Sequence, residues 1–153
     1  MVFLTVLAGT ILVLDQTTKL LVLWHLPLHG MRAIVPGFFN LVHVRNTGGA
    51  FSMFAGSGSA LRLGLFIGLA VIVVCIIFYA YSKVSKTDHW TRAAYSAIAG
   101  GALGNLLDRV RLGEVIDFLD FHAGSYHWPA FNVADMAITT GAIMLLVSLV
   151  RGK

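Results

Sequence analysis

Four stretches of this chain are long and apolar enough to cross a lipid bilayer, which requires about 20 mostly apolar residues in a helix. They cover approximately residues 2–26, 60–81, 90–107 and 131–150. Hydrophobic residues fill 58% of the 153 positions and charged residues only 12%, which favours an integral membrane protein over a water-soluble globule. The sequence therefore predicts a mainly α-helical membrane protein with four transmembrane helices, in one domain over residues 1–153.

The first apolar stretch has a rival interpretation as a cleaved signal peptide. No basic segment precedes its apolar residues and no clear A-x-A cleavage site follows them, so we expect a retained helix. The single cysteine, Cys75, lies inside the second stretch, which excludes an intramolecular disulfide bond and a thiolate metal cluster. The net charge of +4 reflects few acidic residues rather than a basic patch, so nucleic acid is not an expected partner.

Four spans place both chain termini on the same side of the membrane. Five basic residues of one loop and of the tail lie on that side: Lys83, Lys86, Arg92, Arg151 and Lys153. The positive-inside rule makes this side cytoplasmic. The bias is weakened by four arginines on the other side: Arg32, Arg45, Arg109 and Arg111. The segments at about residues 27–59 and 108–130 are then predicted to be outer loops.

Both predicted outer loops contain segments with strand-like patterns. Residues 42–45 alternate between apolar and polar side chains, and residues 114–121, EVIDFLDF, are also typical of a strand. A small extracytoplasmic sheet is therefore expected to cap the helices. The glycine pair at 48–49 permits a tight turn, and residues 50–54, AFSMF, form an apolar ridge suited to the membrane surface.

The polar residues of the predicted spans all fall near the outer surface. With both termini cytoplasmic, they come late in the first and third spans and early in the fourth: Asp15, Lys19, Asn105, Asp108, Arg109, Asn132 and Asp135. Asp15 and Lys19 are spaced i, i+4, as in a helical ion pair. Gly101, Asn105 and Asp108 share one helix face. Arg109 is adjacent to Asp108 and so points toward other partners.

Asp135 lies inside an apolar run, where a charged side chain is expensive to bury, so it is a candidate functional residue in need of a partner. Asp117 is the candidate partner. Two close carboxylates share one proton, so one can activate water as a general base and the other can protonate a leaving amine. The sequence leaves open which does which, and also whether Asp117 is only a turn residue. Amides of Asn46, Asn105 and Asn132 are candidates to hold a peptide backbone or orient the carboxylates.

The sequence contains fewer of the residues that a nucleophilic, metal-dependent or transport mechanism would require. No serine lies in a G-x-S-x-G pattern or beside a lysine in a span, which argues against an acyl-enzyme. Asp120, His122 and His127 are close together, but no HExxH pattern is present and a metal site is not expected. The alternative function is a proton-coupled transporter or channel subunit. It needs a path to both faces, yet the cytoplasmic halves of the spans lack ionisable residues beyond their ends. A structural subunit, the third interpretation, would leave the grouped ionisable residues without a strong reason for their placement.

The chain also resembles a known family, the lipoprotein signal peptidases or type II signal peptidases. The resemblance covers nearly the whole chain and is carried by five blocks: DQTTK, NTGGAFS, GALGNLLDRV, VIDFLDF and FNVADMAI. It implies a four-span aspartic endopeptidase of the bacterial plasma (inner) membrane, with an interfacial helix beside the active site and the small outer sheet. Such an enzyme cleaves prolipoproteins just before a cysteine that carries diacylglycerol. We expect a monomer in contact with membrane lipid, with its site near the outer face and no cofactor.

Carried over position by position, the resemblance assigns the catalytic pair to Asp117 and Asp135, and it favours Asp117 over the competing Asp120. It assigns site support or substrate binding to seven polar residues: Asp15, Lys19, Asn46, Asn105, Asp108, Arg109 and Asn132. Gly101 joins these candidates because it shares a helix face with Asn105 and Asp108.

Overall fold

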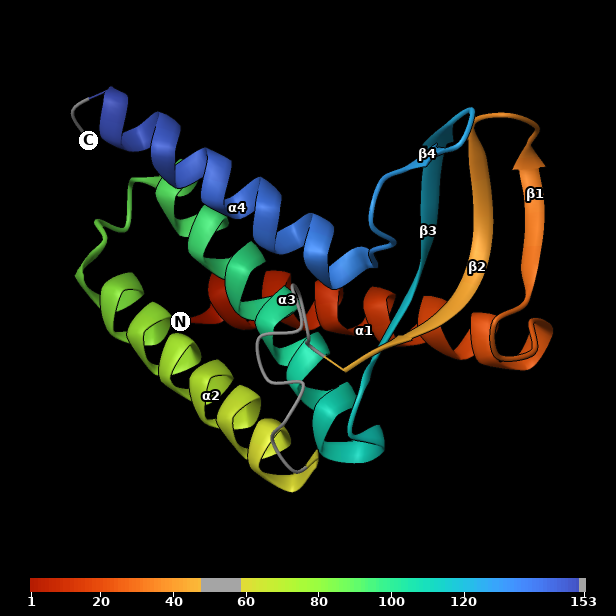
Figure 1. The fold of residues 1–153 in the computed structure, drawn as a ribbon. Coiled ribbons are helices and arrows are strands. Elements are labelled where there is room, and N and C mark those ends of the chain that lie inside the picture. The colour runs from red at the N-terminus through yellow and green to blue at the C-terminus, as the bar shows by residue number, and fades with distance from the viewer. Residues whose placement is uncertain (48–58, 152–153) are drawn as a thin grey trace.

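The computed structural model describes residues 1–47 and 59–151 as four long helices and a small sheet. The helices are α1 (Val2–His25), α2 (Ser59–Lys83), α3 (His89–Leu112) and α4 (Val133–Val150). Both termini lie at one end of the helices and the sheet lies at the other (Figure 1). The predicted glycine turn at 48–49, the apolar ridge at 50–54 and the interfacial helix fall outside the described residues.

All four predicted spans form helices, but only three of the described helices are apolar and long enough to cross a membrane: Val2–His25, Leu63–Lys83 and Val133–Val150. The exception is α3, which carries several polar and small residues. This helix packs against each of the other three and buries nine of its residues (Figure 1). Because its neighbours are mainly helices rather than lipid, α3 can be less apolar than the spans around it.

Glycines on α3 permit close packing against the neighbouring helices. A Cβ atom added to Gly100 would lie 2.8 Å from the carbonyl oxygen of Ala8 on α1. A Cβ atom on Gly101 would overlap the carbonyl oxygen of Ala134 on α4. Small residues at such contacts allow helix backbones to approach closely. Gly101 therefore sets the distance between α3 and the start of α4.

We expect Gly101→Ala to destabilise the protein by about 1–3 kcal/mol, because the added methyl group meets backbone that cannot move aside easily. Unfolding in mixed micelles with increasing denaturing detergent measures the change. Gly64→Ala is the matched control, since an added Cβ at Gly64 of α2 meets nothing within 4 Å. Equal stability of the two variants would contradict the packing role of Gly101.

The sheet contains four antiparallel strands in the order β1-β2-β3-β4. Their bounds are β1 (Met31–Val35), β2 (Phe39–Asn46), β3 (Val115–Ala123) and β4 (Tyr126–His127). The two strands predicted from sequence correspond to β2 and β3. Strand β1 was not predicted, because it is exposed along its whole length and lacks the apolar alternation that reveals a half-buried strand. Strand β4 was not predicted either, since it has only two residues.

Backbone contacts fix where β3 and α4 meet. Helix α3 ends at Leu112, and the left-handed backbone of the next residue, Gly113 (φ 78°), turns the chain directly into β3. Near the start of α4, the Phe131 N–H donates to Leu119 O at 3.1 Å, and Phe131 O accepts from Phe118 N at 3.1 Å. The first turn of α4 is therefore tied to the middle of β3.

Candidate active site

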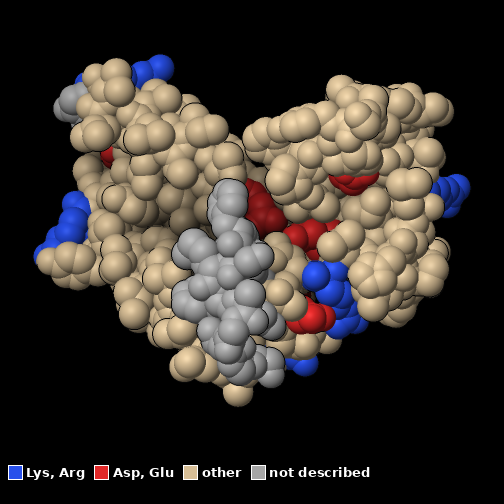
Figure 2. Space-filling model, in the orientation of Figure 1, with Lys and Arg blue, Asp and Glu red and all other residues tan. Residues whose placement is uncertain are grey.

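Asp117 and Asp135 line the same cavity, which has a volume of about 630 Å³. Asp117 lies on β3 opposite Val44 of β2 and is 3% exposed, so its interpretation as a turn residue is wrong. Asp135 lies in the first turn of α4. The other lining residues come from β2 and from residues 128–140: Asn46, Trp128, Pro129, Ala130, Phe131, Met136, Thr139 and Thr140. Figure 2 shows acidic surface at the bottom of a notch between the sheet and the helices.

A reciprocal cap at the start of α4 orients the Asp135 carboxylate. The Asp135 N–H donates to the side-chain oxygen of Asn132 at 2.9 Å, and Asp135 Oδ2 accepts from the Asn132 N–H at 3.2 Å. This capping box satisfies two backbone donors and leaves Asp135 few alternative rotamers. Asp135 is thus held by the same turn that begins its helix.

Two asparagine amides connect the aspartates. Asn132 Nδ2 donates to Asp117 Oδ1 at 2.7 Å and to Asn105 Oδ1 at 3.2 Å. Asn105 Nδ2 in turn donates to Asp135 Oδ1 at 2.8 Å. On the other side, Asn46 Nδ2 donates to Asp117 Oδ2 at 2.9 Å. Each carboxylate is therefore held by neutral donors from elements that are distant in sequence.

Behind the cavity lies a buried cluster of charges that does not itself line it. The Lys19 ammonium is 2.7 Å from both Asp15 Oδ2 and Asp108 Oδ2. All three residues are at most 1% exposed. The predicted Asp15–Lys19 pair is therefore present but is only half of the cluster. Asp15 Oδ1 also accepts from the backbone N–H of Ala134 at 2.9 Å, so the cluster anchors the start of α4.

The cluster is joined to the candidate catalytic pair by one bond, from Lys19 Nζ to Asn105 Oδ1 at 3.1 Å. Gln16 is a member that the sequence analysis missed, although it follows Asp15 directly in DQTTK. Its Nε2 donates to Asp108 Oδ1 at 2.9 Å, and its Oε1 accepts from Arg111 Nη1 at 3.2 Å. The side chain of Gln16 is thus hydrogen-bonded to both the exposed Arg111 and the buried carboxylate of Asp108.

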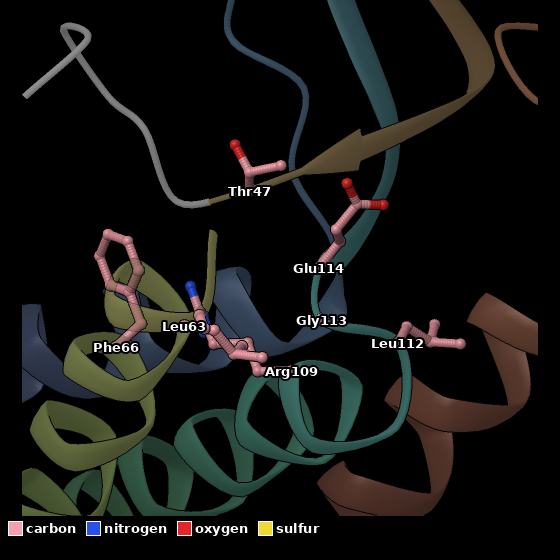
Figure 3. Close-up of a pocket in the computed structure, with 8 residues that line it drawn as sticks. Thr47, Leu63, Phe66, Arg109, Leu112, Gly113 and Glu114 are labelled. Atoms are coloured by element: carbon pink, nitrogen blue, oxygen red, sulfur yellow. The ribbon is translucent and has the colours of Figure 1, made fainter. Parts of the chain in front are cut away.

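Arg109 points away from Asp108, as adjacency predicted. Its guanidinium lies 5.4 Å from the ring centroid of Phe66 on α2, and Nη1 donates to Asn105 O at 3.3 Å. Arg109 lines a second cavity of about 400 Å³ with Thr47, Phe66 and Glu114 (Figure 3). Gly101 lines neither cavity and contributes through packing against Ala134.

Asp120 lies outside the cavity and has partners of its own. Its Oδ2 accepts from Asn40 Nδ2 at 2.8 Å, and its Oδ1 is 2.8 Å from His127 Nδ1. Burial acts to raise the pKa of Asp120, but these two partners outweigh it and hold the pKa below its ordinary value. Within residues 1–47 and 59–151, no group of three or more His, Cys, Asp or Glu side chains is placed to hold a metal ion.

Burial raises the pKa of Asp117 from its ordinary 3.8 to about 6. The hydrogen bonds from Asn46 and Asn132 and the charge of Lys19 act in the opposite direction, while the nearby Asp135 carboxylate raises the pKa further. A carboxyl group with this pKa carries a proton over much of the mildly acidic range. Asp117 is therefore suited to hold a proton that a partner carboxylate does not.

This raised pKa leads to a pH-dependent stability. The native state binds the Asp117 proton more tightly than the unfolded state does, so the stabilisation is complete below about pH 4 and is lost as the pH rises through about 6. We expect wild type to lose up to about 3 kcal/mol relative to Asp117→Asn over this window. Unfolding at several pH values measures the difference. Asp120→Asn is the control, because the carboxyl group of Asp120 has a lowered pKa and titrates below this window. Parallel curves of stability against pH for wild type and Asp117→Asn would contradict the raised pKa of Asp117.

Comparison with known proteins identifies the family. The family model described as "Signal peptidase (SPase) II" matches residues 7–151. This chain belongs to the signal peptidase II family. It is 43% identical over 153 residues to the lipoprotein signal peptidase of Desulforapulum autotrophicum, covering all of this chain and 94% of that protein. It is 45% identical over 150 residues to that of Geobacter sulfurreducens, covering 98% and 92%.

Two solved structures of a bacterial membrane enzyme, obtained by the in meso method, share this fold. They align with TM-scores of 0.87 and 0.84 at 29% identity, covering 98% and 97% of this chain and 94% and 87% of theirs. The predicted family, the integral membrane fold and the class of signal peptidase II hydrolase are confirmed by these matches. The transporter alternative finds no support in them.

Proposed function

We propose that this chain is an intramembrane aspartic endopeptidase that cleaves the signal peptides of diacylglyceryl-modified prolipoproteins just before the modified cysteine. One observation carries the proposal: in a chain of the signal peptidase II family, two carboxyl groups, Asp117 and Asp135, open into a single cavity between the sheet and the helices. No other pair of acidic residues lines that cavity among the described residues.

The reaction requires the pair to hold one proton between them. The deprotonated carboxylate takes a proton from water as the water oxygen attacks the carbonyl carbon of the scissile peptide bond. The protonated carboxyl group then donates its proton to the amide nitrogen as the carbon–nitrogen bond breaks. The products are a new carboxylic acid and a free amine, which ionise to carboxylate and ammonium in water, and the pair is again singly protonated. The two groups titrate as a unit, so the shared proton belongs to the pair rather than to either carboxyl group alone.

Neutral amides suit this reaction better than charged neighbours would. Asn46 and Asn132 hold Asp117 by its two oxygens, and Asn105 holds Asp135. A direct cation on either carboxylate would favour its ionised form strongly and oppose protonation. The buried Lys19 is hydrogen-bonded to Asn105 rather than to either carboxylate of the pair in the described residues, so its charge acts on the pair at a distance. We propose that Asp15, Asp108 and Arg109 position this network rather than contact the scissile bond.

The location of the cavity agrees with a lipid-anchored substrate. It lies where the sheet meets the start of α4, one of the three helices apolar enough to span a membrane. We propose four membrane spans in a single domain, with α3 enclosed by the others, both termini cytoplasmic and the site near the outer face of the bacterial inner membrane. The acyl chains of the substrate would then remain in the outer leaflet while its peptide enters the cavity. We further propose that the enzyme works as a monomer.

Purified protein is expected to hydrolyse a lipobox peptide that carries diacylglycerol on its cysteine. The same peptide without the lipid should be cleaved far more slowly, since the lipid anchors the scissile bond at the depth of the site. Chromatography of the products, with mass spectrometry to locate the cut, measures both rates. Because two carboxyl groups suffice for the chemistry, a chelator should leave the rate unchanged. Inhibition by chelator that added metal reverses would contradict the mechanism.

A further inference from the structure

The helix ends remote from the sheet carry basic side chains that lie on aromatic rings. The connection between α2 and α3 and both termini are found there, and Figure 2 shows Lys and Arg atoms at this end (Figures 1 and 2). Lys83 lies 5.3 Å from the ring centroid of Tyr79, and Arg151 lies 5.7 Å from that of Trp90. Cations on ring faces are attracted by the aromatic quadrupole and keep their hydrogen-bond donors free.

Arg92 is the most enclosed of these basic residues. It extends from α3 between Phe3 of α1, at 5.9 Å, and Tyr81 of α2, at 4.8 Å, and it is half-buried. A guanidinium group stacked on rings directs its N–H donors outward in its own plane. The donors of Arg92 are therefore fixed in direction by three helices at once.

Within residues 1–47 and 59–151, the side chain of Arg92 has no carboxylate partner. The neighbouring acid, Asp88, accepts from the backbone N–H of Thr91 and caps α3. Tyr81 is only 2% exposed, and its buried hydroxyl group has no hydrogen-bond partner in the same residues. A guanidinium group without a carboxylate partner is available to bind another anion. An anion with several acceptor oxygens would satisfy several of the Arg92 donors.

We propose that this end of the bundle binds the phosphate group of an anionic membrane phospholipid, with Arg92 as its main donor. Arginine matches phosphate geometry through two parallel hydrogen bonds, and Lys83 and Arg151 supply additional positive charge at the same end of the helices. Exposed Trp90 and Tyr79, at 42% and 69%, are typical of the headgroup region of a bilayer. Val150 of α4, at the same end of the helices, is 88% exposed and suits contact with acyl chains. These exposed side chains favour a lipid over a soluble phosphate.

Native mass spectrometry of the full-length protein, released from micelles with phosphatidylglycerol or phosphatidylcholine, tests the proposal. Wild type is expected to retain phosphatidylglycerol preferentially. Arg92→Met should weaken its binding about tenfold, the loss expected when one charge-assisted pair is removed. Lys86→Met removes the same charge from an exposed side chain that has no ring partner in the described part of the chain, and should change binding less than twofold. Arg92→Lys, which keeps the charge but not the fork, should recover only part of the affinity.

Three outcomes would overturn the proposal. One is equal retention of the lipid by wild type and Arg92→Met. Another is an equal loss in Arg92→Met and Lys86→Met, which would indicate diffuse attraction without a built site. The third is protection against thermal unfolding by millimolar inorganic phosphate as strong as that by phosphatidylglycerol, which would indicate a soluble ligand. If Arg92→Met fails to fold, unchanged binding in Arg92→Lys decides against the site. Because lipid retention is read without turnover, this test is independent of the proposed peptidase activity.

Discussion

Asp117→Asn and Asp135→Asn are each expected to abolish most turnover, lowering kcat by about 10²-fold to 10⁴-fold, the usual contribution of general acid–base catalysis. An amide cannot take a proton from water, and it is a very poor donor to a leaving amine. Neither change alters side-chain volume much, so the packing of β3 and α4 should persist. Cleavage of the lipid-modified peptide measures the loss.

Asp120→Asn is the matched control for these two variants. Asp120 lies three residues from Asp117 on the same strand, yet its carboxylate is held by Asn40 and His127 outside the cavity. We expect it to keep most of the wild-type rate. Substantial turnover in Asp117→Asn or Asp135→Asn would rule out the pair, and loss of turnover in Asp120→Asn instead would transfer the role to Asp120. Circular dichroism should show that all three variants remain folded.

Lys19→Met is expected to have the largest effect on stability, a loss of about 3–5 kcal/mol, because it leaves two buried carboxylates without their cation. Asp15 and Asp108 are both 2.7 Å from the Lys19 ammonium and are almost fully buried. Asp15 also holds the backbone of α4 at Ala134, so the variant should loosen the start of α4 as well. Denaturing detergent added to mixed micelles measures the free energy of unfolding.

A triple variant separates charge from packing in this cluster. Lys19→Met combined with Asp15→Asn and Asp108→Asn removes all three charges, and we expect it to recover much of the stability that Lys19→Met loses. Lys86→Met, at an exposed position, should change stability by less than about 0.5 kcal/mol. A triple variant as unstable as Lys19→Met would mean that the side chain of Lys19 acts mainly through packing.

The sequence was most informative about the helices and the strands beside them. Apolar runs predicted α1, α2 and α4, because a helix that faces lipid must be apolar along its length. The third span was also predicted as a helix, yet its composition alone does not qualify it to span a membrane. Alternation predicted β2, but the exposed β1 carries no such signal. Helices and half-buried strands can be predicted because their environment determines which positions along the sequence are apolar.

Contacts between polar residues on different helices could not be predicted from the sequence. Spacing predicted that Asp15 and Lys19 would pair, since i, i+4 neighbours meet on any helix. It gave no sign that Asp108, 89 residues after Lys19, would share the same ammonium. Gln16 was overlooked for the same reason, because three of its partners, Asp108, Gly104 and Arg111, lie on another helix.

The sequence by itself determined the membrane class, the helices and the identity of the residues worth testing, since hydropathy and local spacing are properties of consecutive residues. Tertiary structure alone decided that Asp117, on a strand, and Asp135, in a helix cap, open into one cavity. It also decided that Asp120 lies outside it. Strand pairing and helix contacts bring together residues that are far apart along the chain, and no local pattern encodes which carboxylates will meet.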